Sequence, residues 1–200
     1  GRTIVGICAS GILIRAIAPH LADKHSEPPV IAVAEDGSSA VPLLGGHHGA
    51  NDLARRIAAL CHGHAAVTTA SEVRFGFALD DPAPGFVLAN PQHMKPATAA
   101  LLNGAKLALK GDLNPFPSAT FESDGEVAVT VTERHVEGSE HALVYHPKTL
   151  VMGLGCERNA DASELIALAE QVLANTGLSS ASLAAVASID LKSDESAIHA

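Results

Sequence analysis

The sequence is poor in aromatic and basic residues. Its 200 residues include no tryptophan, one tyrosine and five phenylalanines, and 13 basic residues stand against 22 acidic ones, a formal net charge of −9. Nucleic-acid-binding proteins present a basic stripe or face, and those that bind single strands stack bases on aromatic side chains. We therefore expect no nucleic-acid partner.

Long hydrophobic runs and a targeting leader are also lacking. No apolar run approaches the ~20 residues that a membrane-spanning helix needs. The opening GRTIVGICASG shows no charged leader before a cleavable apolar stretch. The three cysteines, Cys8, Cys61 and Cys156, are odd in number and far apart, which is typical of free thiols in a reducing compartment. These features predict a cytoplasmic protein with no membrane partner.

The sequence does contain enough apolar material for a packed core, since 47% of its residues are hydrophobic and 18% are charged. Short apolar runs typical of strands cover residues 3–9, 30–34, 40–44 and 65–70. The pair Asp36-Gly37 between the second and third runs predicts a hairpin. Strands that alternate with helices predict a Rossmann-like α/β region with parallel strand pairs.

Two helices are predicted within this first region. Ser10 is expected to cap a helix that Pro19 kinks or ends. A second helix is indicated by the spacing of Leu53, Ile57 and Leu60, which would share one face.

The rest of the chain is predicted as two further regions. Residues 73–145 form a connecting region, rich in proline, with a helix over about 91–102 and a half-exposed strand over 126–131. From residue 146 the α/β pattern resumes, with a strand that ends in a glycine turn, a helix and a strand over 186–192.

The helix of this last region has clear end signals. Asp161 and Ser163 are expected to cap its start and Gly177 to stop it. The chain begins with Gly1 rather than Met and stops at Ala200 soon after another helix could begin. We therefore expect a fragment that lacks both ends of the protein.

The run Gly45-Gly46-His47-His48-Gly49 stands between a predicted strand and a predicted helix. Glycines let a backbone turn sharply and approach a ligand closely, and the free N–H groups of a helix start attract carboxylates or phosphates. The alternative, which the spacing leaves open, is a tight connection with two exposed histidines. The turn over Gly6–Gly11 lacks the Lys-Ser/Thr of a P-loop, so a nucleotide site is disfavoured.

Other reactive residues have simpler interpretations. Cys61-His62-Gly63-His64 has no second ligand pair at zinc spacing, so it predicts a helix end rather than a metal site. Cys156 could act as a nucleophile, but nothing in the sequence places a base beside it. Asp194 and Glu195 are expected on an ion-paired surface.

Two blocks of the sequence resemble the CbiG family of cobalamin-biosynthesis proteins. VAEDGSSAVPLLGGHHGANDLARRIA with AVTTA resembles the first conserved region of that family. KTLVMGLGCERN and AAVASIDLKSDE resemble the start of its C-terminal region, which also occurs alone as the small protein CobE. The resemblance covers about residues 1–72 and 146–200 and implies a CobE-like second domain. The first region would lack an opening βα unit.

The middle of the chain is similar to a variant in which a CbiG region is fused to the precorrin-3B C17-methyltransferase CobJ. The segments FGFALDDPAPGFVLANP and HMKPATAALLNG carry this similarity. It implies a fused or associated precorrin methyltransferase as a partner.

The resemblance implies hydrolysis of the ring-A δ-lactone of cobalt-precorrin-5A, with loss of acetaldehyde, and cobalt only as part of the substrate. That chemistry needs a base, donors for a developing oxyanion and a basin for a polycarboxylate macrocycle. His47 or His48 is expected to serve as base or acid near neutral pH. The competing hypothesis is a non-catalytic corrinoid-binding or delivery module.

The residues expected to contact the corrinoid follow predicted strand ends. In the first region they are Ser10, Gly11, Glu35, Asp36, Gly45, Gly46, Gly49, Asn51, Thr68 and Thr69, which we expect near one another. In the last region they are Gly153, Gly155, Cys156, Asp190 and Lys192. For Asn51, orienting a substrate carbonyl and capping its helix are both open. Because the substrate is anionic, a locally positive site is expected, and the candidates for its charge are Arg15, Lys24, Arg55 and Lys192.

Overall fold

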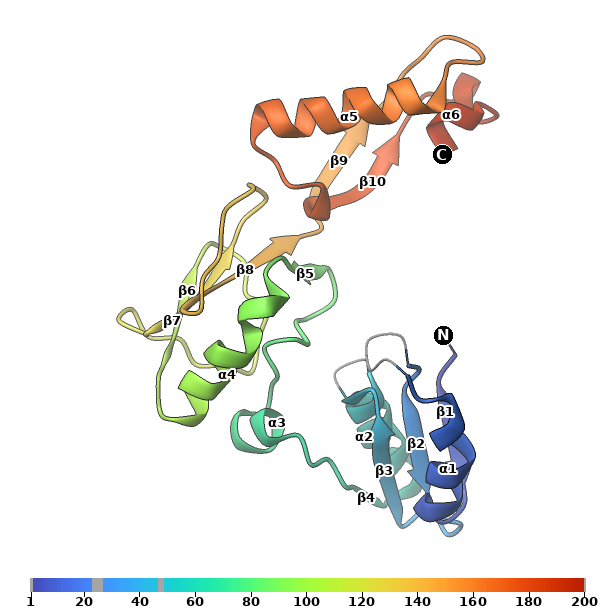
Figure 1. The fold of residues 1–200 in the computed structure, drawn as a ribbon, viewed down its shortest axis with the longest axis vertical. Helices are drawn as coiled ribbons and strands as arrows, with labels where there is room; N and C mark the ends of the chain where they lie inside the picture. Colours follow the sequence, from blue (N-terminus) through green and yellow to red (C-terminus); the bar gives the residue numbers. More distant parts are fainter. Residues whose placement is uncertain (1, 23–26, 47–48, 200) are drawn as a thin grey trace. The chain divides into compact units, whose positions relative to one another are not determined.

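The computed structural model describes residues 2–22, 27–46 and 49–199 (Figure 1). The chain divides into two compact units, Gly1–Asp81 and Pro82–Ala200. Within the described ranges, no helix has the length and the apolar character required to cross a membrane.

The first unit is built on a four-stranded sheet in the order β1-β2-β3-β4. Its strands are β1 (Ile4–Ile7), β2 (Val30–Val33), β3 (Ser39–Leu44) and β4 (His64–Ala65). β1 pairs parallel with β2, β2 antiparallel with β3, and β3 parallel with β4. The predicted hairpin is confirmed, but the predicted strand over 65–70 is wrong beyond Ala65, because the chain leaves the sheet there.

Among the elements that lie wholly within the described residues, three α-helices and a short 3₁₀ turn complete this unit. They are α1 (Ser10–Ile17), η1 (Ala18–His20), α2 (Ala50–Cys61) and α3 (Ala70–Phe75). Pro19 lies in η1, directly after the end of α1, as predicted. The prediction that Ser10 caps α1 is wrong: Ala9 holds the cap position, Ser10 begins the helix, and no side chain caps it.

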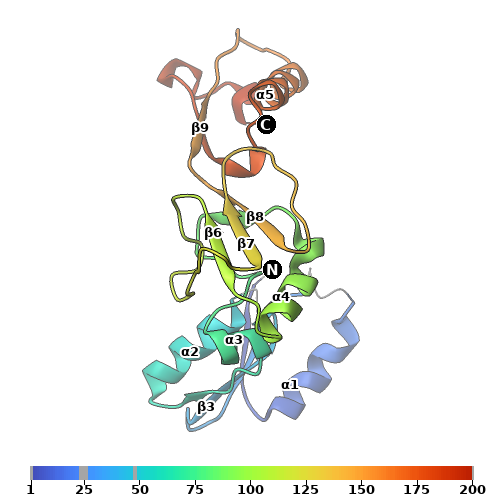
Figure 2. The ribbon, with the colours of Figure 1, turned by 90° about the vertical axis from the view of Figure 1, so that its left-hand side faces the viewer.

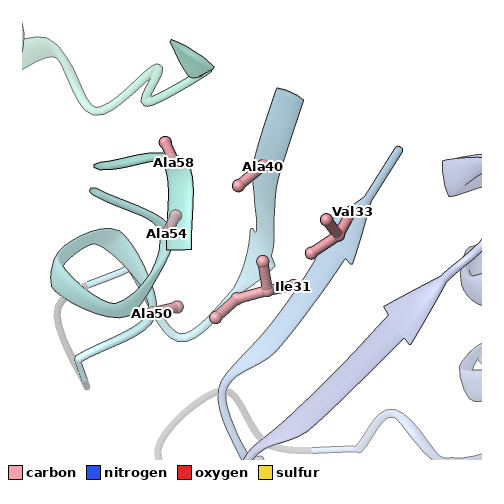
Figure 3. Close-up of a cluster of buried hydrophobic side chains, with 6 residues drawn as sticks. All are labelled: Ile31, Val33, Ala40, Ala50, Ala54 and Ala58. Carbon is pink, nitrogen blue, oxygen red and sulfur yellow. The ribbon is translucent and has the colours of Figure 1, made fainter. Parts of the chain in front are cut away.

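α1 and α2 lie on opposite faces of the sheet (Figure 2). The face under α2 is the core of the unit, and Figure 3 shows its buried side chains: Ile31, Val33, Ala40, Ala50, Ala54 and Ala58. The small alanines of α2 recur every four residues, so one face of the helix approaches the strands closely. Leu53 and Ile57 pack at the margin of this cluster as predicted. Leu60 does not, since it is 82% exposed.

The second unit begins with a four-stranded sheet in the order β5-β8-β7-β6. Its strands are β5 (Phe86–Leu88), β6 (Leu107–Lys110), β7 (Val127–Val131) and β8 (Ala142–Pro147). The predicted helix over 91–102 is confirmed as η3 (Pro91–His93) followed by α4 (Met94–Leu102). The strand predicted over 126–131 is confirmed, but its half-exposed pattern is wrong: β7 is internal, and four of its five residues are buried.

A parallel pair of strands, β9 (Leu150–Gly153) and β10 (Leu183–Ala187), completes the second unit. α5 (Ala162–Thr176) connects them, followed by η4 (Ser180–Ser182), and η5 (Asp190–Lys192) and α6 (Ser196–His199) come after β10. The strand predicted over 186–192 is therefore displaced, since β10 ends at Ala187. Both units are mixed α/β, as the sequence predicts.

Candidate functional site

The carboxyl ends of β1 and β2 meet at one edge of the first sheet, because these strands are parallel. A depression of about 360 Å³ lies there, and Cys8, Ser10, Glu35 and Ser39 contribute to its lining. Among the described residues that line it, Glu35 alone carries a charge. This edge therefore presents hydroxyl groups and a carboxylate to a ligand.

Gly11 and Asp36 lie at the same edge, and each takes part in local structure. The Gly11 carbonyl accepts a hydrogen bond from Arg15 Nη1 at 3.0 Å. Asp36 Oδ1 accepts one from the Ser38 backbone N–H at 2.9 Å in the hairpin turn. Hydrogen bonds from the Ser38 side chain and backbone lower the pKa of Asp36.

The glycine loop lies at the opposite edge of the sheet. In the antiparallel pairing of β2 and β3, Leu44 stands beside Val30 and Ala40 beside Val33, so β3 ends where β2 begins. The prediction that this loop lies near Gly11 and Glu35–Asp36 is therefore wrong. β4 runs parallel with β3, and Thr68 and Thr69 follow it on the loop's side.

At two positions of this loop, the backbone conformation itself favours glycine. Gly45 has φ of +67°, and a Cβ there would stand 2.8 Å from the Cα of Pro29. Gly49 has φ of +89° and occupies the cap position of α2, so the cap residue has no side chain to bond the first turn. These are backbone conformations that favour glycine. His47 and His48, the predicted catalytic residues, lie outside the described residues.

A buried cluster of polar side chains lies beside the loop. Asn51, 2% exposed, donates through its Nδ2 to Thr69 Oγ1 at 3.0 Å and to Glu72 Oε1. Its carboxamide also lies against Gly46, where a Cβ would come within 3.1 Å of Nδ2. Asn51 therefore neither caps α2 nor offers a free amide donor to a substrate carbonyl. Thr68 is exposed.

Glu72 is the acceptor of this cluster, and sequence reasoning missed it. Its side chain is 5% exposed and is also paired with Arg55 Nη2. Burial acts to lower the pKa of Arg55, but the hydrogen bonds and charges of Glu72 and Asp52 outweigh it, so that pKa is raised. Glu72 stands 21 residues from Asn51, and no spacing rule connects them. Since Arg55 is paired with two carboxylates, it adds little net positive charge to this edge.

The predicted residues of the second unit are brought to one edge of the parallel pair β9–β10. Gly153 is the last residue of β9, and Gly155 and Cys156 follow it, whereas Asp190 and Lys192 lie in η5, which follows β10. The backbone N–H of Leu154 donates to Ala187 O at 2.8 Å, and Ser188 Oγ donates to Leu154 O at 2.8 Å.

Side chains tie the two loops together at this edge. Arg158 donates to Asp194 at 2.6 Å and to the Leu191 carbonyl at 2.7 Å. The expected surface ion pair is confirmed for Asp194, which is largely exposed. It is wrong for Glu195, which is 3% exposed and accepts a hydrogen bond from the Asn159 backbone N–H at 3.3 Å.

The predicted helix end at Cys61-His62 is confirmed, because His62 is the C-cap of α2 with φ of +55°. Across the described ranges, no three His, Cys, Asp or Glu side chains are grouped so that they could hold a metal ion. The three cysteines are free thiols.

The structure thus defines a mixed α/β protein whose predicted ligand-binding residues follow the ends of three parallel strand pairs. The family model described as Cobalamin synthesis G N-terminal matches residues 1–72, and that described as Cobalamin synthesis G C-terminus matches residues 150–200. The chain therefore belongs to the CbiG family of cobalamin-synthesis proteins.

Individual relatives agree with this assignment. The chain is 30% identical to a cobalt-precorrin-5A hydrolase of Priestia megaterium, over 97% of this chain and 59% of the relative. It is 28% identical to the enzyme of that name from Salmonella typhimurium, over 96% of this chain and 60% of the relative. The chain thus spans about three fifths of the length of these hydrolases.

Two further similarities concern a small protein and a solved structure. A 49-residue stretch, 24% of this chain, is 53% identical to Protein CobE of Sinorhizobium sp. and covers 32% of that protein. A crystal structure of a cobalamin biosynthesis protein G homolog from Sulfolobus solfataricus has a TM-score of 0.46 and 19% identity, over 96% of this chain and 60% of that one.

Proposed function

We propose that this protein acts in cobalamin biosynthesis by hydrolysing the δ-lactone of cobalt-precorrin-5A with release of acetaldehyde, which gives cobalt-precorrin-5B. The observation that carries this proposal is the similarity to the Priestia hydrolase, which extends over 97% of the chain. The free cysteines support a cytoplasmic location.

The edge that follows β3 and β4 is the better candidate for the reaction than the edge that follows β1 and β2. A corrinoid carries peripheral carboxylates, and the carboxylate of Glu35 in the β1–β2 depression would repel them. The first turn of α2 offers backbone N–H groups that no described side chain caps, which favours an anion or a developing oxyanion.

Base and acid functions are proposed for His47 and His48, because histidine titrates near neutral pH and both stand in this loop in the sequence. A base here would remove a proton from the attacking water while the lactone carbonyl gains negative charge. The corrinoid is the proposed partner, and cobalt enters only as part of it.

The test is an assay of the purified 200-residue chain with cobalt-precorrin-5A, in which acetaldehyde is measured by coupling to alcohol dehydrogenase. We expect acetaldehyde release from the wild type and a fall of about 100-fold or more in His47→Ala/His48→Ala. His64→Ala, which changes an exposed histidine of β4, is the matched control and should keep full release. Undiminished release by the double variant would overturn the assignment of the two histidines.

A second candidate is a corrinoid-binding or delivery module without catalysis, working with a fused or associated precorrin methyltransferase. It is supported by the 53% identity over 49 residues to Protein CobE, a relative whose name is not that of a hydrolase. Tight binding of cobalt-precorrin-5A, followed through its visible absorbance, without any acetaldehyde would decide for this module.

A further inference from the structure

Four side chains beside the glycine loop form a hydrogen-bond network in which the donor and the acceptor of each bond are fixed. Arg55 donates to Glu72, Asn51 donates to the same carboxylate, and the same Asn51 nitrogen donates to Thr69 Oγ1. The chain of bonds joins α2 to the segment that follows β4.

The direction follows from the chemistry of the groups. A guanidinium only donates, and an ionised carboxylate only accepts. The Asn51 atom that faces Glu72 must therefore be the amide nitrogen, and both of its hydrogens are then used. Thr69 Oγ1, which receives the second of them, acts as an acceptor toward Asn51.

The hydroxyl hydrogen of Thr69 is left available by this arrangement. Thr69 holds the cap position of α3, where a threonine oxygen usually accepts from a backbone N–H of the first helical turn. Here it makes no such bond. No described residue accepts a hydrogen bond from the Thr69 hydroxyl, and the residue is only half buried.

The cluster also determines where this donor stands relative to the loop. Gly46 lies against the Asn51 carboxamide, so the loop backbone and the Thr69 hydroxyl rest on the same buried amide. Asn51 is 2% exposed and Glu72 8% exposed, so water has little access to either. A buried amide whose two N–H hydrogens are both bonded is a rigid support.

We propose that Thr69 donates its hydroxyl hydrogen to an oxygen of a ligand bound beside Gly46 and the start of α2, and that Asn51 and Glu72 are positioning residues that set the direction of this donor. The inference rests on the proposed function for the identity of the ligand. A corrinoid offers suitable acceptors in its lactone carbonyl and its peripheral carboxylates.

The decisive variant is Glu72→Gln, because it keeps the shape of the cluster and reverses its direction. Arg55 can only donate, so the glutamine oxygen would turn toward Arg55 and its NH₂ group toward Asn51. Asn51 would then present its oxygen to residue 72 and to Thr69. The Thr69 hydroxyl would donate to Asn51 and would no longer serve the ligand.

Binding of cobalt-precorrin-5A, titrated by its visible absorbance, tests this reversal. We expect Glu72→Gln and Thr69→Val each to weaken binding or turnover by about 10- to 100-fold, and Thr69→Ser to restore it. In the Thr69→Val background, Glu72→Gln should cause no further loss. Glu122→Gln, which alters the partner of Lys106, is the matched control and should bind like the wild type.

The kinetic readout distinguishes the two acceptors. A loss confined to kcat indicates the lactone carbonyl, whereas a loss in affinity with kcat unchanged indicates a peripheral carboxylate. Additive effects of the two substitutions, or a Thr69→Ser variant as weak as Thr69→Val, would overturn the proposal.

A measurement without ligand separates this inference from the proposed function. In ¹⁵N-labelled wild type, the two Asn51 side-chain hydrogens should exchange slowly, since both are bonded inside the cluster, and Asn51→Asp identifies their signals. In Glu72→Gln they should exchange faster, because they turn away from both acceptors. If exchange is unchanged in Glu72→Gln, the proposed reversal is wrong. If the wild type protects these hydrogens but does not bind the corrinoid, the proposed function and the role of Thr69 are wrong, and only the fixed direction of the hydrogen bonds is retained.

Discussion

The two glycine-rich loops that lead from a strand into a helix are held in different ways. In the loop before α2, Gly45 has a positive φ and lies against Pro29, and a buried amide lies beneath Gly46. Before α5, a Cβ on Gly153, which ends β9, or on Gly155, which lies in the loop, would meet no atom within 4 Å, and neither has a positive φ. The first loop depends on the conformation and size of glycine, whereas side-chain hydrogen bonds fix the second.

The helices that follow these loops differ in the same sense. α2 presses a face of buried alanines onto a four-stranded sheet. α5 buries only Leu165 and Leu173 of its 15 residues, and Leu168 is 55% exposed. A close alanine contact leaves no room for larger side chains, so the first loop is anchored by packing that the second does not have.

The strongest test of this difference is to make the same substitution, glycine to alanine, before each helix. Gly45→Ala should destabilise the first unit by about 3 kcal/mol, because alanine resists positive φ and its Cβ would meet the Pro29 backbone. The measurement is urea-dependent hydrogen exchange of the α2 amides, read by mass spectrometry.

Gly153→Ala is the matched control, and it should change the stability of the second unit by less than about 0.5 kcal/mol. Equal losses in the two variants would show that both loops depend on glycine in the same way. The difference drawn between them would then be wrong.

A smaller effect is expected from filling the helix faces. Ala54→Leu should destabilise the first unit by about 2 kcal/mol, because Ala54 is fully buried against the sheet and a larger side chain would push α2 away from the strands. Ala167→Leu on the exposed side of α5 should be neutral within about 0.5 kcal/mol. Thermal unfolding followed by circular dichroism checks both, and a neutral Ala54→Leu would show that α2 can move away from the sheet.

Much of the fold could be predicted because local signals agree with tertiary contacts. Asp161, Ser163 and Gly177 mark the ends of α5 correctly, since capping depends on neighbours in the sequence. The prediction is wrong for the burial of Leu60 and for the half-exposed pattern of residues 126–131, because burial depends on what packs against a segment from elsewhere in the chain. β7 is an internal strand of its sheet, paired with β6 and β8, which precede and follow it by many residues.

The candidate site shows where local reasoning stops. The hairpin at Asp36-Gly37 was predicted, and it already implies that β3 reverses the direction of β2, yet the residues after both strands were expected together. Reversal sends them to opposite edges. Glu72 carried no signal at all, because its role arises from two contacts that the fold makes with residues 17 and 21 positions away.

The smallest effect that we expect is a pH dependence in the stability of the start of α5, which the start of α2 should not share. Asp161 caps α5 by accepting hydrogen bonds from Ser163 Oγ and from the Ser163 backbone N–H, at 2.7 and 2.8 Å, whereas Gly49 gives α2 no side-chain cap. These two bonds, the side-chain one first, lower the pKa of Asp161 below its ordinary 3.8. Because the folded-state pKa lies below that of the unfolded chain, the cap stabilises α5 above pH 3.8, and its contribution is lost as the pH falls through the lowered pKa.

An NMR titration of the Asp161 carboxyl carbon should show this lowered pKa. Ser163→Ala should move it back toward 3.8, and exchange of the first-turn amides of α5 should quicken over the same range. A wild-type carboxyl that titrates at 3.8 or above, or a Ser163→Ala variant that titrates like the wild type, would remove the cap as the feature that distinguishes α5 from α2.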